Sequence, residues 1–187
     1  MVVRKIKPTD ISHVAQIHVE AFGGFFLTSL GEGFLKMYYS LGIKAPDSIS
    51  LCAENETGEI VGFCFGTEAA KGFHKRLIKR NMLAFVLQGL KVFFYRPKAI
   101  VRLILNLEKK TDNGDKGDYS ELLSIAVKKN IVSKGVGSKL LDQFEQEAKA
   151  RGCKKISLTA DVDNSDSVVA FYEKCGYKRF SRFVTYP

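Results

Sequence analysis

The sequence predicts an α/β or α+β fold, and three observations lead to this expectation. β-rich runs alternate with helical patterns along the 187 residues, a length that suits a single domain over 1–187. Two β-rich runs, Ile49–Asn55 and Glu59–Ala69, are separated by the turn Glu56–Gly58, which predicts an antiparallel hairpin. Later in the chain, strand, helix, strand, helix and strand patterns follow one another, as in βαβ units packed on a sheet.

The elements before the hairpin follow from hydrophobic periodicity. Val2–Ile6 alternates and predicts a first strand. Ile11–Phe22 has its apolar residues on one helical face, so a helix is expected there. A loop over Phe25–Leu30 and a short helix over Glu32–Leu41 complete this part of the chain.

A basic segment follows the hairpin. Between Lys71 and Arg102 the chain carries nine Lys or Arg and no acid, whereas the rest carries 20 cations and 20 anions. Apolar residues from Leu77 to Leu90 suit a helix, and Pro97 fits the first turn of a second one. Residues 71–110 are therefore expected to form a basic helical insertion, whose charge suggests an anionic partner nearby.

The last part of the chain predicts two more βα pairs. Tyr119–Val127 is a mostly apolar strand of the kind found in a sheet centre. An amphipathic helix starts near Gly135, and Lys154–Ala160 predicts the next strand. Ser165–Cys175 predicts a helix, and Tyr177–Tyr186 a final extended segment.

Composition excludes several classes of protein. The four cysteines are far apart without a C-x-x-C pair, and there are only three histidines, so no metal site and no disulfide framework are expected. The acids of Thr111–Asp118 lack the register of a calcium loop. No apolar signal region opens the chain, and the longest uncharged apolar run, Asn81–Leu90, is too short to span a bilayer. We therefore expect a soluble cytoplasmic protein without integral membrane association.

Two glycines, Gly135 and Gly137, stand where a strand pattern gives way to a helical one. Free N–H groups at a helix start favour an anion, and glycine lets it approach closely. A P-loop needs a Gly-Lys pair, which the chain lacks, and a dinucleotide fingerprint needs a glycine where Leu140 stands. Both nucleotide motifs are excluded, while close helix–strand packing remains an alternative reason for the glycines.

The segment Ser124–Phe180 resembles the GNAT superfamily of acyl-CoA-dependent N-acyltransferases. The resemblance covers the glycine turn, the amphipathic helix, the next strand and the DN…FYEKCGY helix end. Leu30–Tyr39 followed by Gly58–Gly66 looks like a branch of this family with a long insertion between the third and fourth strands. The resemblance implies a mixed, mostly antiparallel central sheet flanked by helices and splayed beside the fourth strand.

The same resemblance implies acetyl-CoA (coenzyme A) as the acyl donor. The family's pyrophosphate loop falls on 132–137, where Val132 replaces the usual Arg or Gln and Lys128, Lys129 or Lys134 could compensate. A backbone N–H near Ala126 or Val127 would face the thioester carbonyl. The expected cofactor-binding residues are Ile125, Ala126, Val127, Val132, Ser133, Lys134, Gly135, Val136, Gly137, Ser138, Asn164 and Tyr172.

A tyrosine and a carboxylate are the candidate catalytic groups. Tyr172 falls on the family's tyrosine, which would protonate the departing CoA thiolate; a ring packed in the core is the alternative reading. Glu121 opens the predicted central strand and is our candidate general base. Glu20 and Glu32 are rivals, and each of the three could instead be a solvated surface acid. Asn164 lies one residue further from Tyr172 than the family spacing, so either the turn absorbs an extra residue or Ser165 takes the contact.

The expected reaction is direct transfer of an acetyl group from acetyl-CoA to the primary amine of a small-molecule acceptor, for which an anionic amine is one candidate. The alternative is a non-catalytic CoA-binding protein whose basic insertion associates with a membrane or a nucleic acid. The readings we favour for the insertion are a segment that packs its apolar face on the domain and exposes a solvated charged face, or a lid over an anionic acceptor. Direct nucleic-acid binding is not expected, because aromatic residues build cores more often than stacking platforms. The apolar insertion helices could also pair two subunits as a homodimer.

Overall fold

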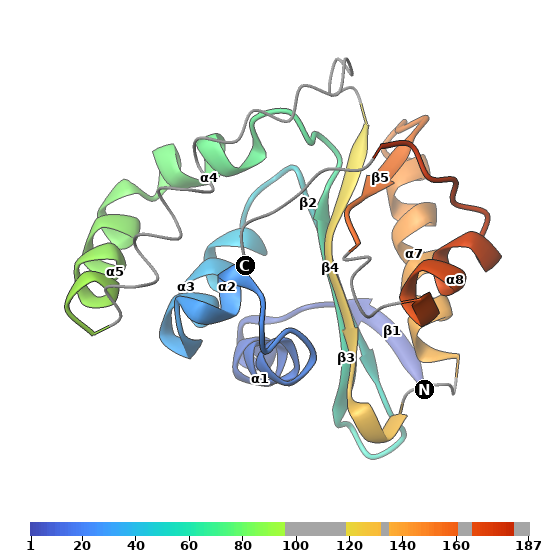
Figure 1. The fold of residues 1–187 in the computed structure, drawn as a ribbon, viewed down its shortest axis with the longest axis horizontal. Coiled ribbons are helices and arrows are strands. Elements are labelled where there is room, and N and C mark those ends of the chain that lie inside the picture. The colour runs from blue at the N-terminus through green and yellow to red at the C-terminus, as the bar shows by residue number, and fades with distance from the viewer. Residues whose placement is uncertain (96–118, 132–134, 161–165, 182–187) are drawn as a thin grey trace.

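The computed structural model describes residues 1–95, 119–131, 135–160 and 166–181. A five-stranded sheet divides the described part of the chain, with the strands in sequence order (Figure 1). Neighbouring strands are antiparallel from the first to the fourth, and the fourth and fifth are parallel. The strands are β1 Val2–Lys5, β2 Ser48–Glu54, β3 Ile60–Thr67, β4 Ser120–Val127 and β5 Ile156–Leu158. The predicted hairpin and the mixed, mostly antiparallel sheet are confirmed.

Helices cover both faces of this sheet (Figure 1). One face carries α1 Ile11–Ala21, α2 Phe26–Ser29 and α3 Glu32–Gly42, and the other carries α7 Val136–Ala150 and α8 Asp166–Lys174. Between β3 and β4 lie α4 Phe73–Arg80 and α5 Met82–Tyr95. Short 3-10 turns occur at Pro8–Asp10 and Lys129–Ile131. No helix among the described residues is long and apolar enough to cross a membrane.

Each face of the sheet has its own apolar core. On the first face, Phe63 and Phe65 of β3 pack with Tyr39 of α3 and with the apolar side of α1. On the second, Leu140 and Phe144 of α7 pack on the opposite side of the same strands. Every residue of β3 is buried, and its nearly continuous apolar sequence is consistent with a strand that is covered on both faces.

Four sequence-based boundaries differ from the structure. The predicted loop at Phe25–Leu30 contains the one-turn helix α2, in which Ser29 Oγ donates to the Phe26 carbonyl at 2.6 Å. The predicted helix through Leu90 is broken at Asn81, which leaves two helices. The strand predicted over Lys154–Ala160 is shorter, since β5 covers only Ile156–Leu158. The extended segment predicted over Tyr177–Tyr186 forms no strand in its described residues, 177–181. The second insertion helix expected after Pro97 lies outside the described residues.

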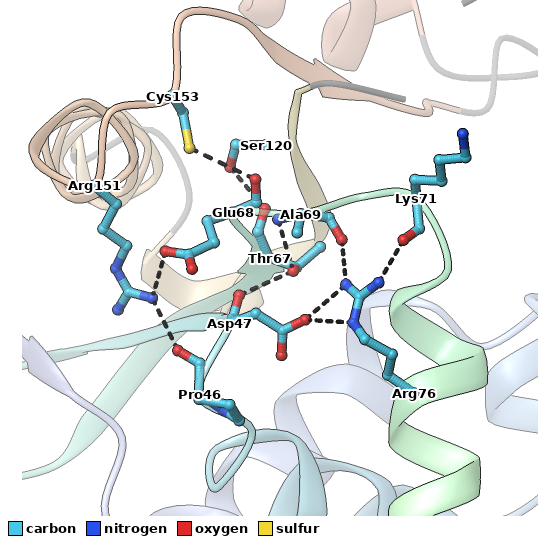
Figure 2. Close-up of polar contacts among 10 residues, drawn as sticks. All are labelled: Pro46, Asp47, Thr67, Glu68, Ala69, Lys71, Arg76, Ser120, Arg151 and Cys153. Atoms are coloured by element: carbon cyan, nitrogen blue, oxygen red, sulfur yellow. Dashed lines mark hydrogen bonds and ion pairs between the residues drawn. The ribbon is translucent and has the colours of Figure 1, made fainter. Parts of the chain in front are cut away.

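The beginning of the insertion is fastened to the sheet by an arginine (Figure 2). Arg76 of α4 donates to the Asp47 carboxylate at 2.7 and 2.9 Å and to the carbonyl oxygens of Ala69 and Lys71. The Asp47 carbonyl in turn accepts from the Thr67 hydroxyl at the end of β3, at 2.9 Å. The start of β2, the end of β3 and α4 are therefore linked through a few charged and polar contacts.

Strand β4 is paired on both sides only at its beginning. Parallel pairing with β5 joins Ser120, Glu121 and Leu122 to Ile156–Leu158. On the other side, the pairing with β3 skips Leu123, which is a β-bulge next to Gly66. From residue 123 onward, no strand in the described part of the chain pairs with the β5 side of β4. The later part of β4 is therefore an unpaired edge among the described residues, at the place where the family resemblance led us to expect a splayed sheet.

Candidate active site

The open edge of β4 presents backbone groups. Ser120 N–H points towards β5 and donates to the Lys155 carbonyl at 2.9 Å, whereas Lys128 N–H points towards β3 and donates to the Val61 carbonyl at 2.9 Å. The bulge at Leu123 accounts for this reversal, since backbone groups alternate in a regular strand. By the same alternation, Ala126 N–H points to β3, and the N–H groups of Ile125 and Val127 point to the open edge. The backbone group that can face a thioester is therefore at Ile125 or Val127 rather than at Ala126.

Helix α7 begins beside the end of this edge. Its N-cap, Gly135, has a φ of 77° and its backbone is exposed, with nothing within 4 Å of the position of a Cβ. Gly137 is different, because an added Cβ would lie 3.7 Å from Phe171 and 3.9 Å from Val127, which is ordinary contact. The first glycine thus permits a left-handed turn, and the second lies where α7 meets α8 and β4.

The remaining predicted cofactor residues fall into two groups. Val132, Ser133, Lys134 and Asn164 lie outside the described residues. Val136 has a buried side chain, and Ser138 is half-buried in the first turn of α7, so both can offer backbone N–H groups that have no intrahelical acceptor. Lys128, which we considered a substitute for the missing arginine, forms an ion pair with Glu59.

Tyr172 lies in α8, on the α7 side of the sheet. Its half-buried ring packs edge-on against Phe171 and Tyr177, with centroids 5.2 and 5.8 Å away. Tyr172 belongs to the same apolar cluster as Ile125 and Val127 of the open edge. Burial, with smaller contributions from Cys175 and Cys64, raises the pKa of Tyr172 to about 12, so the phenol holds its proton at neutral pH.

The three candidate carboxylates have different surroundings. Glu20 is exposed and accepts a hydrogen bond from Gln16 at 3.1 Å. Glu32 is exposed and pairs with a lysine of its own helix at 2.7 Å. Glu121 is half-buried on β4, and burial raises the pKa of its carboxyl. A raised pKa makes a carboxylate a stronger base, so the structure favours Glu121 among the three.

Sequence analysis did not single out the tyrosine and histidine side chains on the face of the sheet that α1 and α3 cover. Tyr38 of α3 is buried and hydrogen-bonds His74 of α4, with Oη and Nε2 3.2 Å apart. Burial, followed by the charges of Tyr39 and Glu121, raises the pKa of Tyr38 far above its ordinary range. The charge of Glu121 therefore acts on a phenol that joins α3 to the insertion.

A second buried pair lies deeper in the same core. His18 of α1 and Tyr39 of α3 hydrogen-bond at 2.7 Å between Nδ1 and Oη. The His18 side chain is only 3% exposed, and its Nε2 has no hydrogen-bond partner among the described residues. Burial lowers the pKa of His18 to about 4, so the ring is neutral at physiological pH. The spacing of His18 in a helical stripe was the only available sequence signal, and core positions share it.

The sequence matches one protein family, and the fold agrees with that match. A model of the acetyltransferase (GNAT) family matches residues 13–177, and the chain belongs to that family. A curated relative, the uncharacterized protein YdhI of Bacillus subtilis (strain 168), is 41% identical over 54 residues. That match spans 29% of this chain and 33% of the relative, so it covers about a third of each protein.

Solved structures share the whole fold at low sequence identity. The aminoglycoside N-acetyltransferase AAC(6')-Iy, solved in complex with CoA, has a TM-score of 0.66 and 13% identity, covering 100% of this chain and 93% of that one. The enzyme AAC(6')-IG from Acinetobacter haemolyticus has a TM-score of 0.64 and 13% identity, covering 100% and 97%. A transcriptional regulator from Bacillus halodurans has a TM-score of 0.63 and 17% identity, covering 100% and 98%. These likenesses establish the α+β GNAT fold of the chain.

Proposed function

We propose that this protein is an acetyl-CoA-dependent N-acetyltransferase that acetylates the primary amine of a small molecule. The observation that carries the proposal is the open edge of β4 beyond Leu122, which leads towards the glycine start of α7. Pantetheine would pair with the outward groups of Ile125 and Val127. The pyrophosphate would bind at the free N–H groups of Val136, Gly137 and Ser138.

The proposed reaction is a single attack. The carboxylate of Glu121 takes a proton from the bound ammonium group, directly or through a water, and the freed nitrogen attacks the thioester carbonyl. An outward N–H of β4 stabilises the oxyanion that forms. The C–S bond then breaks as the amide is completed, and the phenol of Tyr172 donates its proton to the leaving CoA thiolate. The second proton of the attacking nitrogen passes to the Tyr172 phenolate, directly or through a water, and Glu121 releases its proton to solvent, so that each turnover releases one proton.

The positive charge of the protein limits the charge of the acceptor that it can bind. The net charge is +9, and the described insertion residues 71–95 contain cations but no acid. A protein with this net charge repels a highly cationic acceptor, whereas it does not repel an anionic or neutral amine. We therefore propose an acceptor with one reactive amine and no large positive charge. The aminoglycoside acceptors named for the structural relatives are not our first candidates.

Calorimetric titration with acetyl-CoA tests the cofactor site. S-acetylpantetheine is the matched control, since it carries the same thioester and lacks the pyrophosphate. We expect acetyl-CoA to bind at micromolar concentration and the control to bind at least 100-fold more weakly. Thiol release from acetyl-CoA with a panel of anionic, neutral and polycationic amines then tests the transfer. If millimolar acetyl-CoA gave no binding heat and protected no residue from chemical modification, the enzyme proposal would be wrong.

A further inference from the structure

One face of helix α5 packs against the rest of the protein, and its opposite face is apolar and exposed to solvent. Its inner face packs on α2 and α3, where Val92 is buried against Leu30 and the rings of Phe85 and Phe34 lie 6.2 Å apart. In Figure 1 the helix lies at one end of the molecule, on the side of α3 away from β4. The outer face consists of Met82, Leu83, Val86, Leu87, Leu90, Phe93, Phe94 and Tyr95, whose exposures run from 52% to 84%.

Exposed positive charge borders this apolar face. Lys79 and Arg80 end α4 one residue before α5 begins, and both are exposed. Lys75 of α4 and Lys91 of α5 are exposed as well. No acidic residue occurs among the described residues from Lys71 to Tyr95, so nothing in this stretch neutralises these cations. Large apolar patches are uncommon on monomeric proteins and indicate an interaction surface.

The charge decides which partner suits the surface. A second copy of the chain would bring the same cations against each other, which opposes pairing through this face. A nucleic acid would satisfy the cations but would leave eight apolar side chains without a partner. An anionic lipid surface matches both properties, because headgroups attract the cations and the acyl region accepts the apolar side chains. At 14 residues α5 is about 21 Å long, which suits a helix lying in the interface rather than crossing it.

We propose that α4 and α5 bind the protein reversibly to anionic membrane surfaces. The outer face of α5 enters the headgroup and upper acyl region, while Lys75, Lys79, Arg80 and Lys91 contact lipid phosphates. The contacts of Arg76 with Asp47 and of Phe85 with Phe34 hold the two helices to the domain during binding. This inference is independent of the acetyl transfer proposed above, since it uses none of the groups at β4, α7 or α8.

A tryptophan reporter tests which environment the face enters. The chain contains no Trp, so Phe94→Trp, at a site 75% exposed, provides a single probe on α5. Phe180→Trp, at a site 77% exposed near the other end of the described chain, is the matched control. With vesicles of phosphatidylcholine and 30% phosphatidylglycerol, we expect a blue shift of the Phe94→Trp emission and none of the control. Pure phosphatidylcholine vesicles should give a much smaller shift.

Vesicle sedimentation separates the contribution of the apolar face from the contribution of the cations. Leu83→Glu with Leu87→Glu should abolish binding, and Val168→Glu, at an exposed apolar site on α8, should not change it. Replacing Lys79 and Arg80 by Ala should weaken binding about 30-fold, since each cation near the surface contributes about 1 kcal/mol and 1.4 kcal/mol is tenfold. Lys154 and Lys155, both exposed, are the control pair. Circular dichroism melting checks that every variant is folded.

Three results would overturn the proposal. The first is an emission of Phe94→Trp that is already blue without vesicles, because the face would then be covered by protein. The second is a dimer in analytical ultracentrifugation that Leu87→Glu dissociates, which would assign the face to a second copy of the chain. The third is equal binding to anionic and neutral vesicles, or no binding to either.

Discussion

At the scale of single residues, burial separates groups that look alike in the sequence. Glu20, Glu32 and Glu121 are three carboxylates within or beside regular elements, but only the last of them is half-buried, and burial raises the pKa of its carboxyl. Desolvation disfavours the charged form of a carboxyl group, and this raises its affinity for a proton. Position on the central strand suggested Glu121, and its environment provides a physical reason for the choice.

Glu121→Gln should lower kcat about 100-fold or more at neutral pH, as loss of a general base does, without changing the affinity for acetyl-CoA. Because the carboxyl must be ionised to act, the rate of the unmodified enzyme should fall with decreasing pH, around a pKa above the ordinary 4.5. Steady-state kinetics against pH measures both effects. Glu20→Gln, at an exposed site, is the matched control. If Glu121→Gln kept the full rate, Glu121 would not be the general base.

Tyr172→Phe should lower kcat by about tenfold to 100-fold, because the phenol is protonated below its pKa of about 12 and would no longer be available as an acid. The ring contacts with Phe171 and Tyr177 should persist, so the melting temperature should change little. Kinetics with an activated acyl thioester, whose thiolate leaves without a proton, provides the diagnostic comparison. A rate loss of the same size with that donor would indicate a packing role.

The buried His18 should make stability depend on pH. Its pKa is about 4 in the folded protein and 6.5 in the unfolded chain, so the unfolded chain binds the proton first as pH falls. The free energy of unfolding should therefore decrease by up to about 3 kcal/mol between pH 6.5 and pH 4. Urea unfolding of the protein and of His18→Gln at several pH values isolates this contribution. Parallel curves for the two proteins would contradict it.

At the scale of the elements, the two glycines at the start of α7 have different structural roles. Gly135 has a φ of 77°, a conformation that costs other residues about 1 to 2 kcal/mol. Gly137 is inside the helix, where glycine is about 1 kcal/mol less favourable than alanine and where a methyl group would make only ordinary contacts.

Gly135→Ala should therefore lower the free energy of unfolding by about 1 kcal/mol or more, and Gly137→Ala should raise it by up to about 1 kcal/mol. Chemical denaturation measures both changes. The open space lies at Gly135, so Gly135→Glu should block the pyrophosphate and abolish acetyl-CoA binding, whereas Gly137→Ala, whose methyl would face Phe171 and Val127, should leave the affinity unchanged. Equal affinities of the two variants for acetyl-CoA would contradict a pyrophosphate site at this turn.

At the scale of the whole molecule, the insertion depends on contacts made far from it in sequence. Arg76 joins α4 to Asp47, 29 residues earlier, and its guanidinium also caps the carbonyl oxygens that precede the helix (Figure 2). Through Thr67 the same cluster reaches the end of β3. Because this contact holds the insertion, losing it should loosen α4 and α5 before the sheet unfolds.

Arg76→Ala should lower the free energy of unfolding by about 2 kcal/mol, since hydrogen bonds to a charged group are lost and Asp47 keeps an unpaired carboxylate. Limited proteolysis should cut within residues 71–95 faster than in the unmodified protein. Lys75→Ala is the matched control, because Lys75 is an exposed cation of the same helix. Equal cleavage rates for the two variants would show that the contact between Arg76 and Asp47 does not hold the insertion in place.

The sequence by itself determined the order of the elements, the hairpin, the parallel β4–α7–β5 unit and the family, because periodicity and turn residues are local properties of the chain. It also singled out Gly135, Tyr172 and Glu121. Only the tertiary structure decided that β5 leaves β4 after Leu122, that the bulge at Leu123 turns the N–H groups of Ile125 and Val127 outward, and that His18 and Tyr38 are buried beside distant partners. Strand pairing, burial and the pKa shifts that follow depend on contacts between segments remote in sequence, which no local pattern encodes.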